Sequence, residues 1–254
     1  MKEIIVISSL DNTEQPSLFY EADAPNRPLL VGLHTWSNDR FNQRDNLLPM
    51  AKKNGWNLLL PEFRGPNLVS NQKAEQACGS LLAKQDIIDA INHVVEKYPI
   101  DKESILLLGA SGGGHMALLM AGYAPKLFRA IGSFVPISDL AKWHAENKHY
   151  SAHIERCLGG APSEKTESEY KYRSPISYSS EIAESRLKIF TGKWDSSVPC
   201  HHGLDMYNEI FKAKPDAEVY FEMFDGYHEM PLEYAERWLT SQLGKPRKNE
   251  TVTG

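Results

Sequence analysis

Residues 104–114 read Ser-Ile-Leu-Leu-Leu-Gly-Ala-Ser-Gly-Gly-Gly, and they give the clearest indication of the fold. Its apolar first half is typical of a buried strand, and the small and apolar residues 112–123 after it favour a helix that packs on a sheet. A GxSxG motif centred on Ser111 lies between them. A serine on such a sharp strand-to-helix turn has a strained backbone and needs small neighbours to avoid clashes. The context predicts that Ser111 is a nucleophile.

A glycine-rich turn can also serve only for close packing or for holding a phosphate group. The sequence has no GxxxxGK[ST] motif, and no GxGxxG motif follows its first strand. The lack of both motifs weakens the nucleotide-binding interpretation of the turn.

Short apolar runs alternate with amphipathic ones on both sides of this turn. The predicted strands are residues 4–8, 17–21, 29–34, 57–61, 104–109, 130–135, 187–192 and 218–224, and the predicted helices are 47–54, 81–98, 112–123, 202–212 and 232–243. In the helix 81–98, apolar residues fall on one face, and polar residues, Asp86 among them, fall on the other. The alternation predicts an α/β fold with a mostly parallel central sheet and helices on both faces.

The whole chain, residues 1–254, is predicted to be a single domain. Residues 138–185 interrupt the alternation, because they hold several aromatic residues and no obvious strand. They lie between two core strands, where a small helical cap or lid can be inserted. Residues 245–254 are polar and are expected to form a frayed tail.

A serine nucleophile needs a general base, and the base needs an acid that holds its tautomer. With this kind of elbow, the acid and then the histidine follow the serine along the chain. His228 stands in a glycine-containing loop after the last predicted strand and is the predicted base. Asp195 follows the strand before it and is the favoured acid. Asp139, after the preceding strand, and Asp225, which we expect to cap the loop of His228, are the alternatives.

An oxyanion hole requires two backbone donors. The amide of Gly112, the residue after the nucleophile, is the first candidate. The loop after the strand 29–34 supplies the second, which by position is the amide of Trp36, with Thr35 as the alternative. The Trp36 indole is expected to line the acyl pocket, unless it is simply a core side chain.

The composition restricts the class of partner. The net charge is −5 and there is no basic run, so a nucleic-acid partner is not expected. No segment is long and apolar enough to span a membrane, and the apolar run near the N-terminus is too short for a signal peptide. A cytoplasmic protein is expected, or a secreted one if a leader has been removed. Three widely spaced cysteines make a disulfide framework improbable, and no cofactor or metal site is predicted.

Several segments, taken in order along the chain, resemble the prolyl-oligopeptidase-like branch of the α/β-hydrolase superfamily. They are residues 9–16 (an opening hairpin), 33–36 (an oxyanion loop), 109–114 (the nucleophile motif), 173–176, 192–199 (a G-x-x-D-x-x-VP motif) and 226–228 (a terminal histidine). The resemblance implies the α/β-hydrolase fold and the triad of Ser111, Asp195 and His228. Thr35 departs from the family pattern, which has a glycine there.

The branch contains both peptidases and esterases. The sequence begins close to the hydrolase domain, without the β-propeller that gates the peptidases, and this favours an esterase. We therefore expect cleavage of carboxylic esters through an acyl-enzyme, with acetyl or feruloyl carbohydrate esters as candidate substrates. A peptidase acting on short or acylated peptides is the alternative, and a non-enzymatic binding protein on the same scaffold is a third. The residues expected to flank the pocket are His34, Thr35, Trp143, His144 and Trp194.

Overall fold

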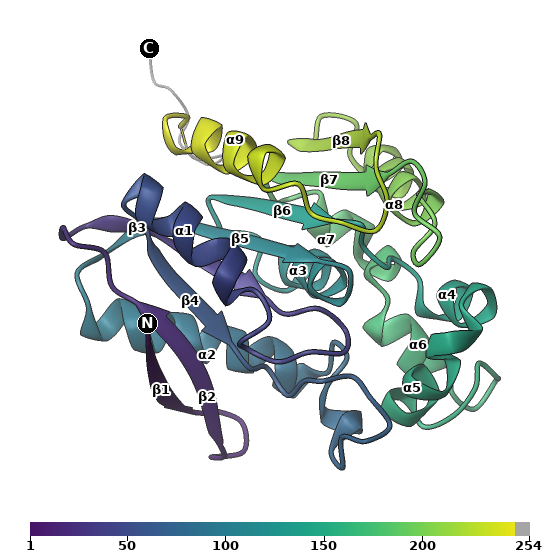
Figure 1. Cartoon of the computed structure of the whole chain (residues 1–254). Coiled ribbons are helices and arrows are strands. Elements are labelled where there is room, and N and C mark those ends of the chain that lie inside the picture. Colours follow the sequence, from purple (N-terminus) through teal and green to yellow (C-terminus); the bar gives the residue numbers. More distant parts are fainter. Residues whose placement is uncertain (247–254) are drawn as a thin grey trace.

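The computed structural model describes residues 1–246, and it contains one eight-stranded sheet with the order β1-β2-β4-β3-β5-β6-β7-β8 (Figure 1). The strands are β1 (Lys2–Ile7), β2 (Glu14–Tyr20), β3 (Arg27–Leu33), β4 (Asn57–Pro61), β5 (Ile100–Ala110), β6 (Ala130–Phe134), β7 (Leu187–Gly192) and β8 (Val219–Phe224). Strand β2 pairs antiparallel with β1 and with β4, and every other neighbouring pair is parallel. The predicted α/β-hydrolase fold with a mostly parallel sheet is confirmed.

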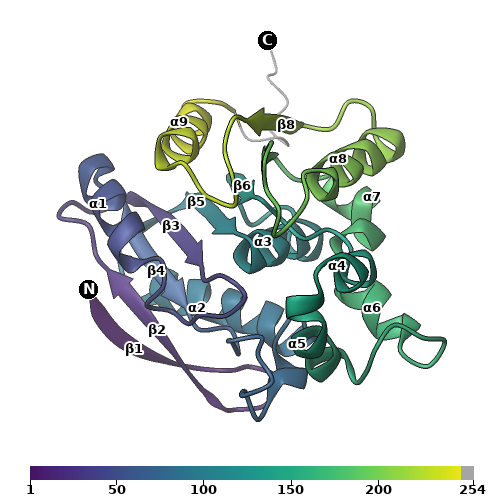
Figure 2. The ribbon, with the colours of Figure 1, turned by 45° about the vertical axis from the view of Figure 1, so that its right-hand side comes forward.

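Helices cover both faces of this sheet, as Figure 2 shows. The helices are α1 (Arg44–Asn54), α2 (Leu81–Lys97), α3 (Gly112–Tyr123), α4 (Leu140–Glu146), α5 (Lys148–Leu158), α6 (Glu167–Arg173), α7 (Ser179–Ile182), α8 (His201–Ala213) and α9 (Leu232–Leu243), with short 3-10 turns η1 (Ala74–Gln76) and η2 (Pro175–Tyr178). Helices α2, α3 and α8 pack on one face, and α1 and α9 pack on the other.

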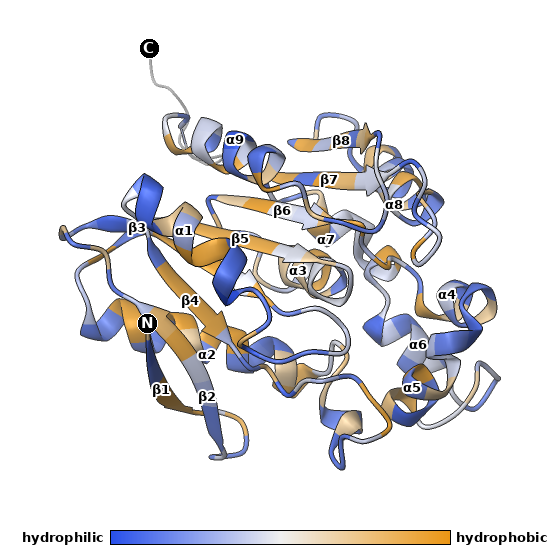
Figure 3. Ribbon diagram, in the orientation of Figure 1, coloured by the Kyte–Doolittle hydropathy of each residue, from blue (hydrophilic) through white to orange (hydrophobic). Residues whose placement is uncertain are grey.

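The two faces are buried because side chains alternate along each strand. In β5, Ile105 and Leu107 belong to the core under α2 and α3, whereas Leu106 and Leu108 belong to the core under α1 and α9. A strand that is buried on both sides is therefore apolar at every position, which is how residues 105–108 read in the sequence. Figure 3 shows the same apolar character along β4 and β5.

Several elements are longer than the sequence pattern indicates. Strand β5 begins at Ile100, which pairs with Arg27 of β3, although polar residues 101–103 break its apolar run. Strand β2 begins at Glu14, since residues 14–17 pair with β1 in an exposed hairpin. Pairing with a neighbouring strand extends both elements beyond the part that hydrophobicity reveals.

The prediction that Asp86 lies on the polar face of its helix is wrong. Asp86 is only 2% exposed, and its carboxylate accepts hydrogen bonds from Ser8 Oγ and from the buried guanidinium of Arg64. Arg64 also donates to Asp11 in the β1–β2 hairpin, and it holds the pKa of that carboxyl well below its usual range. This ion cluster ties the hairpin to α2.

Replacing Asp86 by alanine is expected to destabilise the fold by about 3 kcal/mol, because Arg64 would lose one carboxylate and stay buried with only part of its charge compensated. Urea denaturation followed by circular dichroism measures this change. The matched control is Asp89→Ala on the same helix, at a more exposed position, where a loss below about 1 kcal/mol is expected. Equal losses in the two variants would contradict the role assigned to the ion cluster.

The 138–185 segment forms the helices α4 to α7 and, within the described residues, contributes no strand to the sheet. Its buried side chains build a third core that includes Trp143, Ile154 and Tyr170, and that core reaches Trp36 and Cys78 of other loops. The helical insertion expected between β6 and β7 is therefore present. Of the predicted polar tail, residues 247–254 lie outside the described part of the chain.

Two further findings concern membrane-spanning helices and the cysteine thiols. Among the described residues, no helix combines the length and the apolar character that crossing a membrane requires. The cysteines Cys78, Cys157 and Cys200 are free thiols. Cys78 and Cys157 are buried beside each other, and burial raises the pKa of the Cys78 thiol well above its ordinary value.

Candidate active site

Ser111 occupies the turn between β5 and α3. Its backbone has φ 56° and ψ −119°, a conformation that an L-residue adopts only at a cost of about 1–3 kcal/mol. Two hydrogen bonds hold it there: the Ser111 amide donates to Phe134 O over 2.9 Å, and the His115 amide donates to Ser111 O over 2.8 Å. Close packing adds to the constraint, because a side chain on Gly109 would meet the backbone of Gly113 at 2.2 Å. The turn therefore presents the Ser111 hydroxyl at the end of the sheet.

The predicted base and acid form a chain of hydrogen bonds with this hydroxyl. His228 Nε2 is 2.9 Å from Ser111 Oγ, and His228 Nδ1 is 2.7 Å from Asp195 Oδ2. Since an ionised carboxylate only accepts, Nδ1 carries the proton and donates it to Asp195, which leaves Nε2 free to accept from Ser111. The three side chains come from the loops after β5, β7 and β8.

The Asp195 carboxylate is fixed independently of the histidine. Its other oxygen, Oδ1, accepts from the amides of Ser197 at 2.8 Å and Val198 at 2.9 Å, and the side chain is fully buried. A carboxylate with its acceptor sites filled in this way has one orientation available towards His228.

The structure gives both alternative acids other partners. Asp139 is the N-cap of α4 and accepts from the amides of Ala141 and Lys142. Asp225 accepts from the indole of Trp194 at 2.8 Å, so the expectation that it caps its own turn is replaced by this contact. Neither carboxylate is hydrogen-bonded to His228.

The candidate oxyanion donors belong to two segments that meet beside Ser111. The loop after β3 passes so close to Gly112 that a side chain there would meet Trp36 N at 2.5 Å. The Thr35 amide is already occupied, because it donates to Asn42 Oδ1 over 3.1 Å. Within residues 1–246 the amides of Gly112 and Trp36 donate to no other group. The geometry thus favours Trp36 over Thr35 as the second donor.

A methyl group on Gly112 would collide with the Trp36 backbone and push the loop away from α3. We expect Gly112→Ala to lower kcat by about 10²–10³-fold, the usual effect of losing one oxyanion donor, while the protein stays folded. Steady-state hydrolysis and thermal unfolding of the variant measure both parts. Gly159→Ala, where the added Cβ meets nothing within 4 Å, is the control for activity. Unchanged kcat in Gly112→Ala would exclude the assigned position of the oxyanion.

His34 was expected to contact substrate, but it supports the loop after β3 from the interior of the protein instead. Its ring is buried, stacks on Phe63 with centroids 3.9 Å apart, and lies 2.7 Å from Glu62 O through Nε2. Burial lowers the pKa of His34, so the ring is neutral. His34 is not among the residues that line the pocket beside Ser111.

A pocket of about 280 Å³ opens beside Ser111 and His228. The residues that line it are Thr35, Trp36, Ser37, Asn38, Gln43, Asn46, Ala110, Ser111, Val135, Tyr150, His228, Glu229 and Met230. Thr35, one of the residues expected to flank the pocket, is among these lining residues. Most of the others were missed. Only their positions could have indicated them: Glu229 and Met230 directly follow the base, and Ser37 directly follows the oxyanion loop 33–36.

Three other predicted pocket residues do not line this pocket. Trp143 is 1% exposed and packs edge-on against Trp36, with centroids 4.9 Å apart, and its indole donates to Ser197 O. His144 lies 2.8 Å from Glu155. Trp194 is 55% exposed. Trp143 therefore acts on the site through Trp36, through the pocket residue Tyr150, on which it stacks with centroids 4.9 Å apart, and through the loop of Asp195.

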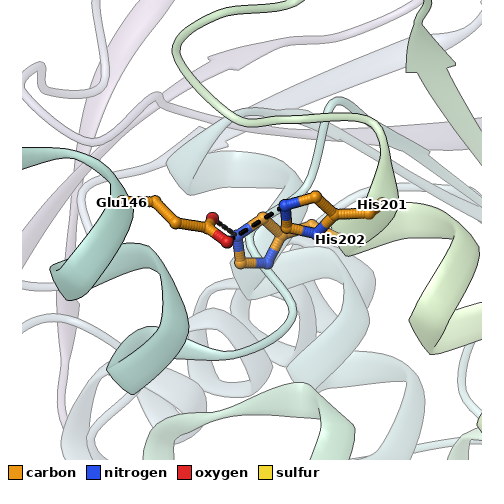
Figure 4. A group of neighbouring side chains, drawn as sticks. All are labelled: Glu146, His201 and His202. Atoms are coloured by element: carbon orange, nitrogen blue, oxygen red, sulfur yellow. Dashed lines mark hydrogen bonds and ion pairs between the residues drawn. The ribbon is translucent and has the colours of Figure 1, made fainter.

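The histidines outside the triad differ in their surroundings. His115 is buried beside Trp36, and burial lowers its pKa to about 4. His201 and His202 are adjacent at the start of α8, and their side chains lie on the same side. Their rings lie 4.9 Å apart, and both approach the carboxylate of Glu146 (Figure 4).

Comparison with known proteins agrees with this geometry. Residues 54–236 match the model of the prolyl oligopeptidase family. The chain is 27% identical over 195 residues to acylamino-acid-releasing enzyme 1 of Oryza sativa, a match that covers 72% of this chain and 25% of that protein. It is 24% identical over 222 residues to the human acylamino-acid-releasing enzyme, covering 79% of this chain and 30% of the relative.

Among solved structures, the acylaminoacyl peptidase of Pyrococcus horikoshii superposes with a TM-score of 0.76 at 20% identity, over 98% of this chain and 42% of the peptidase. The chain spans about a quarter to a third of the length of the two curated relatives. The family model covers well over half of the chain, and the sheet order and the elbow fit the fold that the sequence implied. The chain is a serine hydrolase that belongs to the prolyl oligopeptidase family.

Proposed function

We propose that the protein is a serine peptidase that cleaves short, N-acylated peptides, with Ser111 as nucleophile, His228 as general base and Asp195 as its orienting acid. The observation that supports this proposal most strongly is the continuous chain of hydrogen bonds from Ser111 Oγ through His228 to Asp195. The relatives that release acylated amino acids support the choice of substrate.

The relay can perform acyl transfer in two halves. His228 Nε2 takes the proton of Ser111 as the hydroxyl oxygen attacks the substrate carbonyl, and the amides of Gly112 and Trp36 stabilise the oxyanion. His228 then protonates the leaving amine, so that the C–N bond breaks and an acyl-enzyme remains. Water, deprotonated by the same histidine, releases the acid and restores Ser111.

The polar groups of the pocket suit a blocked peptide. Asn38, Gln43 and Asn46 present neutral amide side chains, which can donate to and accept from peptide groups. Glu229 is the one carboxylate among the pocket-lining residues, and one of its oxygens already accepts from the Tyr227 amide. A free α-ammonium group would need a dedicated anionic partner to be desolvated, whereas an acylated nitrogen needs none.

An ester substrate was predicted from the position at which the sequence begins, and that position does not distinguish between esters and peptides. The relatives are named as an acylamino-acid-releasing enzyme and an acylaminoacyl peptidase, and these names favour a peptide substrate. Tyr150 of the 138–185 segment stands in the pocket wall, so this segment would shape the binding of the peptide.

A matched substrate panel tests the proposal. Acetyl-alanine p-nitroanilide, alanine p-nitroanilide and p-nitrophenyl acetate are offered to the wild type, with Ser111→Ala as the blank. We expect kcat/KM for the acetylated anilide to exceed that of the free-amine anilide by at least tenfold. Hydrolysis of the ester with no measurable cleavage of either anilide would overturn the proposal in favour of an esterase.

A further inference from the structure

Glu146, His201 and His202 form a cluster outside the pocket of Ser111. Glu146 is the last residue of α4, and the two histidines are the first residues of α8, so the cluster joins the 138–185 segment to the helix after the Asp195 loop (Figure 4). Glu146 Oε1 lies 3.1 Å from His201 Nε2, and Oε2 lies 3.1 Å from His202 Nε2. One ligand atom from each residue falls within 4.8 Å of the others.

These separations suit a shared cation. A zinc ion lies about 2.0–2.2 Å from nitrogen and oxygen ligands, which puts two ligand atoms in a tetrahedral arrangement about 3.4 Å apart. Imidazole nitrogens favour zinc and its transition-metal neighbours over magnesium and calcium, which prefer oxygen. Two imidazoles and one carboxylate form the three-ligand set that binds Zn²⁺ and leaves the fourth position open to water.

The surroundings of the two Nδ1 atoms also bear on metal binding. When the Nε2 atom of a histidine binds a metal, Nδ1 keeps its proton and needs an acceptor. Among residues 1–246, His201 Nδ1 is a buried atom with no hydrogen-bond partner, and the carboxylate of Asp205 lies 3.9 Å from it. His202 Nδ1 accepts from the Ser138 amide over 3.4 Å and lies 3.3 Å from Ser138 Oγ, so a metal on Nε2 would require the proton to move to Nδ1 and to be donated to Oγ. Lys142, the nearby cation, is paired with Asp205 at 2.7 Å and is not part of the cluster.

We propose that Glu146, His201 and His202 bind a single divalent transition-metal ion of the zinc class, which fastens α4 to the start of α8. The site is distinct from the hydrolytic pocket, since none of the three residues lines it. The ion would bridge two elements that already meet at the Asp195 loop, where Trp143 and Asn147 both donate to Ser197 O. Its first effect is on the stability of this junction.

Zinc titration of the untagged, chelator-treated protein tests the site directly. We expect isothermal calorimetry to show one Zn²⁺ per chain, and a thermal unfolding midpoint that rises by roughly 5 °C or more at saturating zinc. Glu146→Gln and His202→Gln each remove one of three ligands, so each is expected to weaken binding at least tenfold. Because Glu146 lies near the surface, Glu146→Gln keeps the test valid if the buried His202 variant unfolds.

The matched control is His149→Gln, an exposed histidine of α5 outside the cluster, which should bind zinc like the wild type. Cobalt(II) added in place of zinc should give the visible absorption of a low-symmetry Co²⁺ site in the wild type and not in Glu146→Gln. The proposal is overturned by the absence of saturable zinc binding to the wild type. It is also overturned if Glu146→Gln binds as tightly as the wild type, or if His149→Gln is the variant that loses binding.

Discussion

Replacing Ser111 by alanine is expected to lower kcat on acetyl-alanine p-nitroanilide by at least 10⁴-fold. The substitution removes the one oxygen that His228 Nε2 can deprotonate at this turn, while the oxyanion amides and the pocket remain. The residual rate of the variant is the part of catalysis that substrate binding and the oxyanion hole supply. Steady-state kinetics with purified protein measures the loss.

Folding of Ser111→Ala should be nearly unchanged, because the contacts that hold the turn are made by backbone atoms. Its thermal midpoint is expected within about 2 °C of the wild type. Ser37→Ala is the matched control, since Ser37 lines the same pocket and is not hydrogen-bonded to the histidine. Retained turnover in Ser111→Ala, or an equal loss in Ser37→Ala, would refute the assignment.

The second large effect is expected from Asp195→Asn, which should lower kcat by about 10⁴-fold without unfolding the protein. The asparagine oxygen would keep accepting from the Ser197 and Val198 amides, so its NH₂ group would face His228 Nδ1. His228 Nδ1 would then have to accept a hydrogen bond from the NH₂ group, and the proton of the imidazole ring would move to Nε2. A protonated Nε2 cannot take the proton of Ser111.

Asp139→Asn and Asp225→Asn are the controls for this prediction, and both should retain kcat within about threefold. Asparagine caps a helix about as well as aspartate, so Asp139→Asn also keeps the start of α4 intact. Kinetics on the same anilide compare the three variants. A loss in Asp139→Asn that matched the loss in Asp195→Asn would show that the acid has been misassigned.

The part of the fold that the sequence predicts well is the part with a strong local signal. Residues 105–108 are apolar because both faces of β5 are buried, and the glycines beside Ser111 are required by close backbone packing. Such requirements are visible in a single stretch of chain. The relative positions of Ser111, Asp195 and His228 could be anticipated because the loops at the same end of parallel strands meet.

Other features depend on partners far away in the chain. Asp86 has a polar side chain at a helix position, and its burial is made possible by Arg64, 22 residues earlier, and by Ser8, 78 residues earlier. His201 and His202 are adjacent in α8, and they converge because Glu146 offers one carboxylate oxygen to each. The aromatic residues Trp143 and Trp194 were expected near substrate, but pattern alone does not tell a buried or surface tryptophan from a pocket wall.

Covalent labelling of the folded protein with a fluorophosphonate, followed by mass spectrometry of the intact chain and of its peptides, tests directly whether Ser111 is an activated nucleophile. An activated serine attacks this reagent, whereas an ordinary serine does not. We expect one adduct per chain, located on Ser111 and abolished by His228→Ala. Failure of the folded wild type to label, or an adduct on another serine, would contradict the account and point to a binding protein built on a hydrolase scaffold.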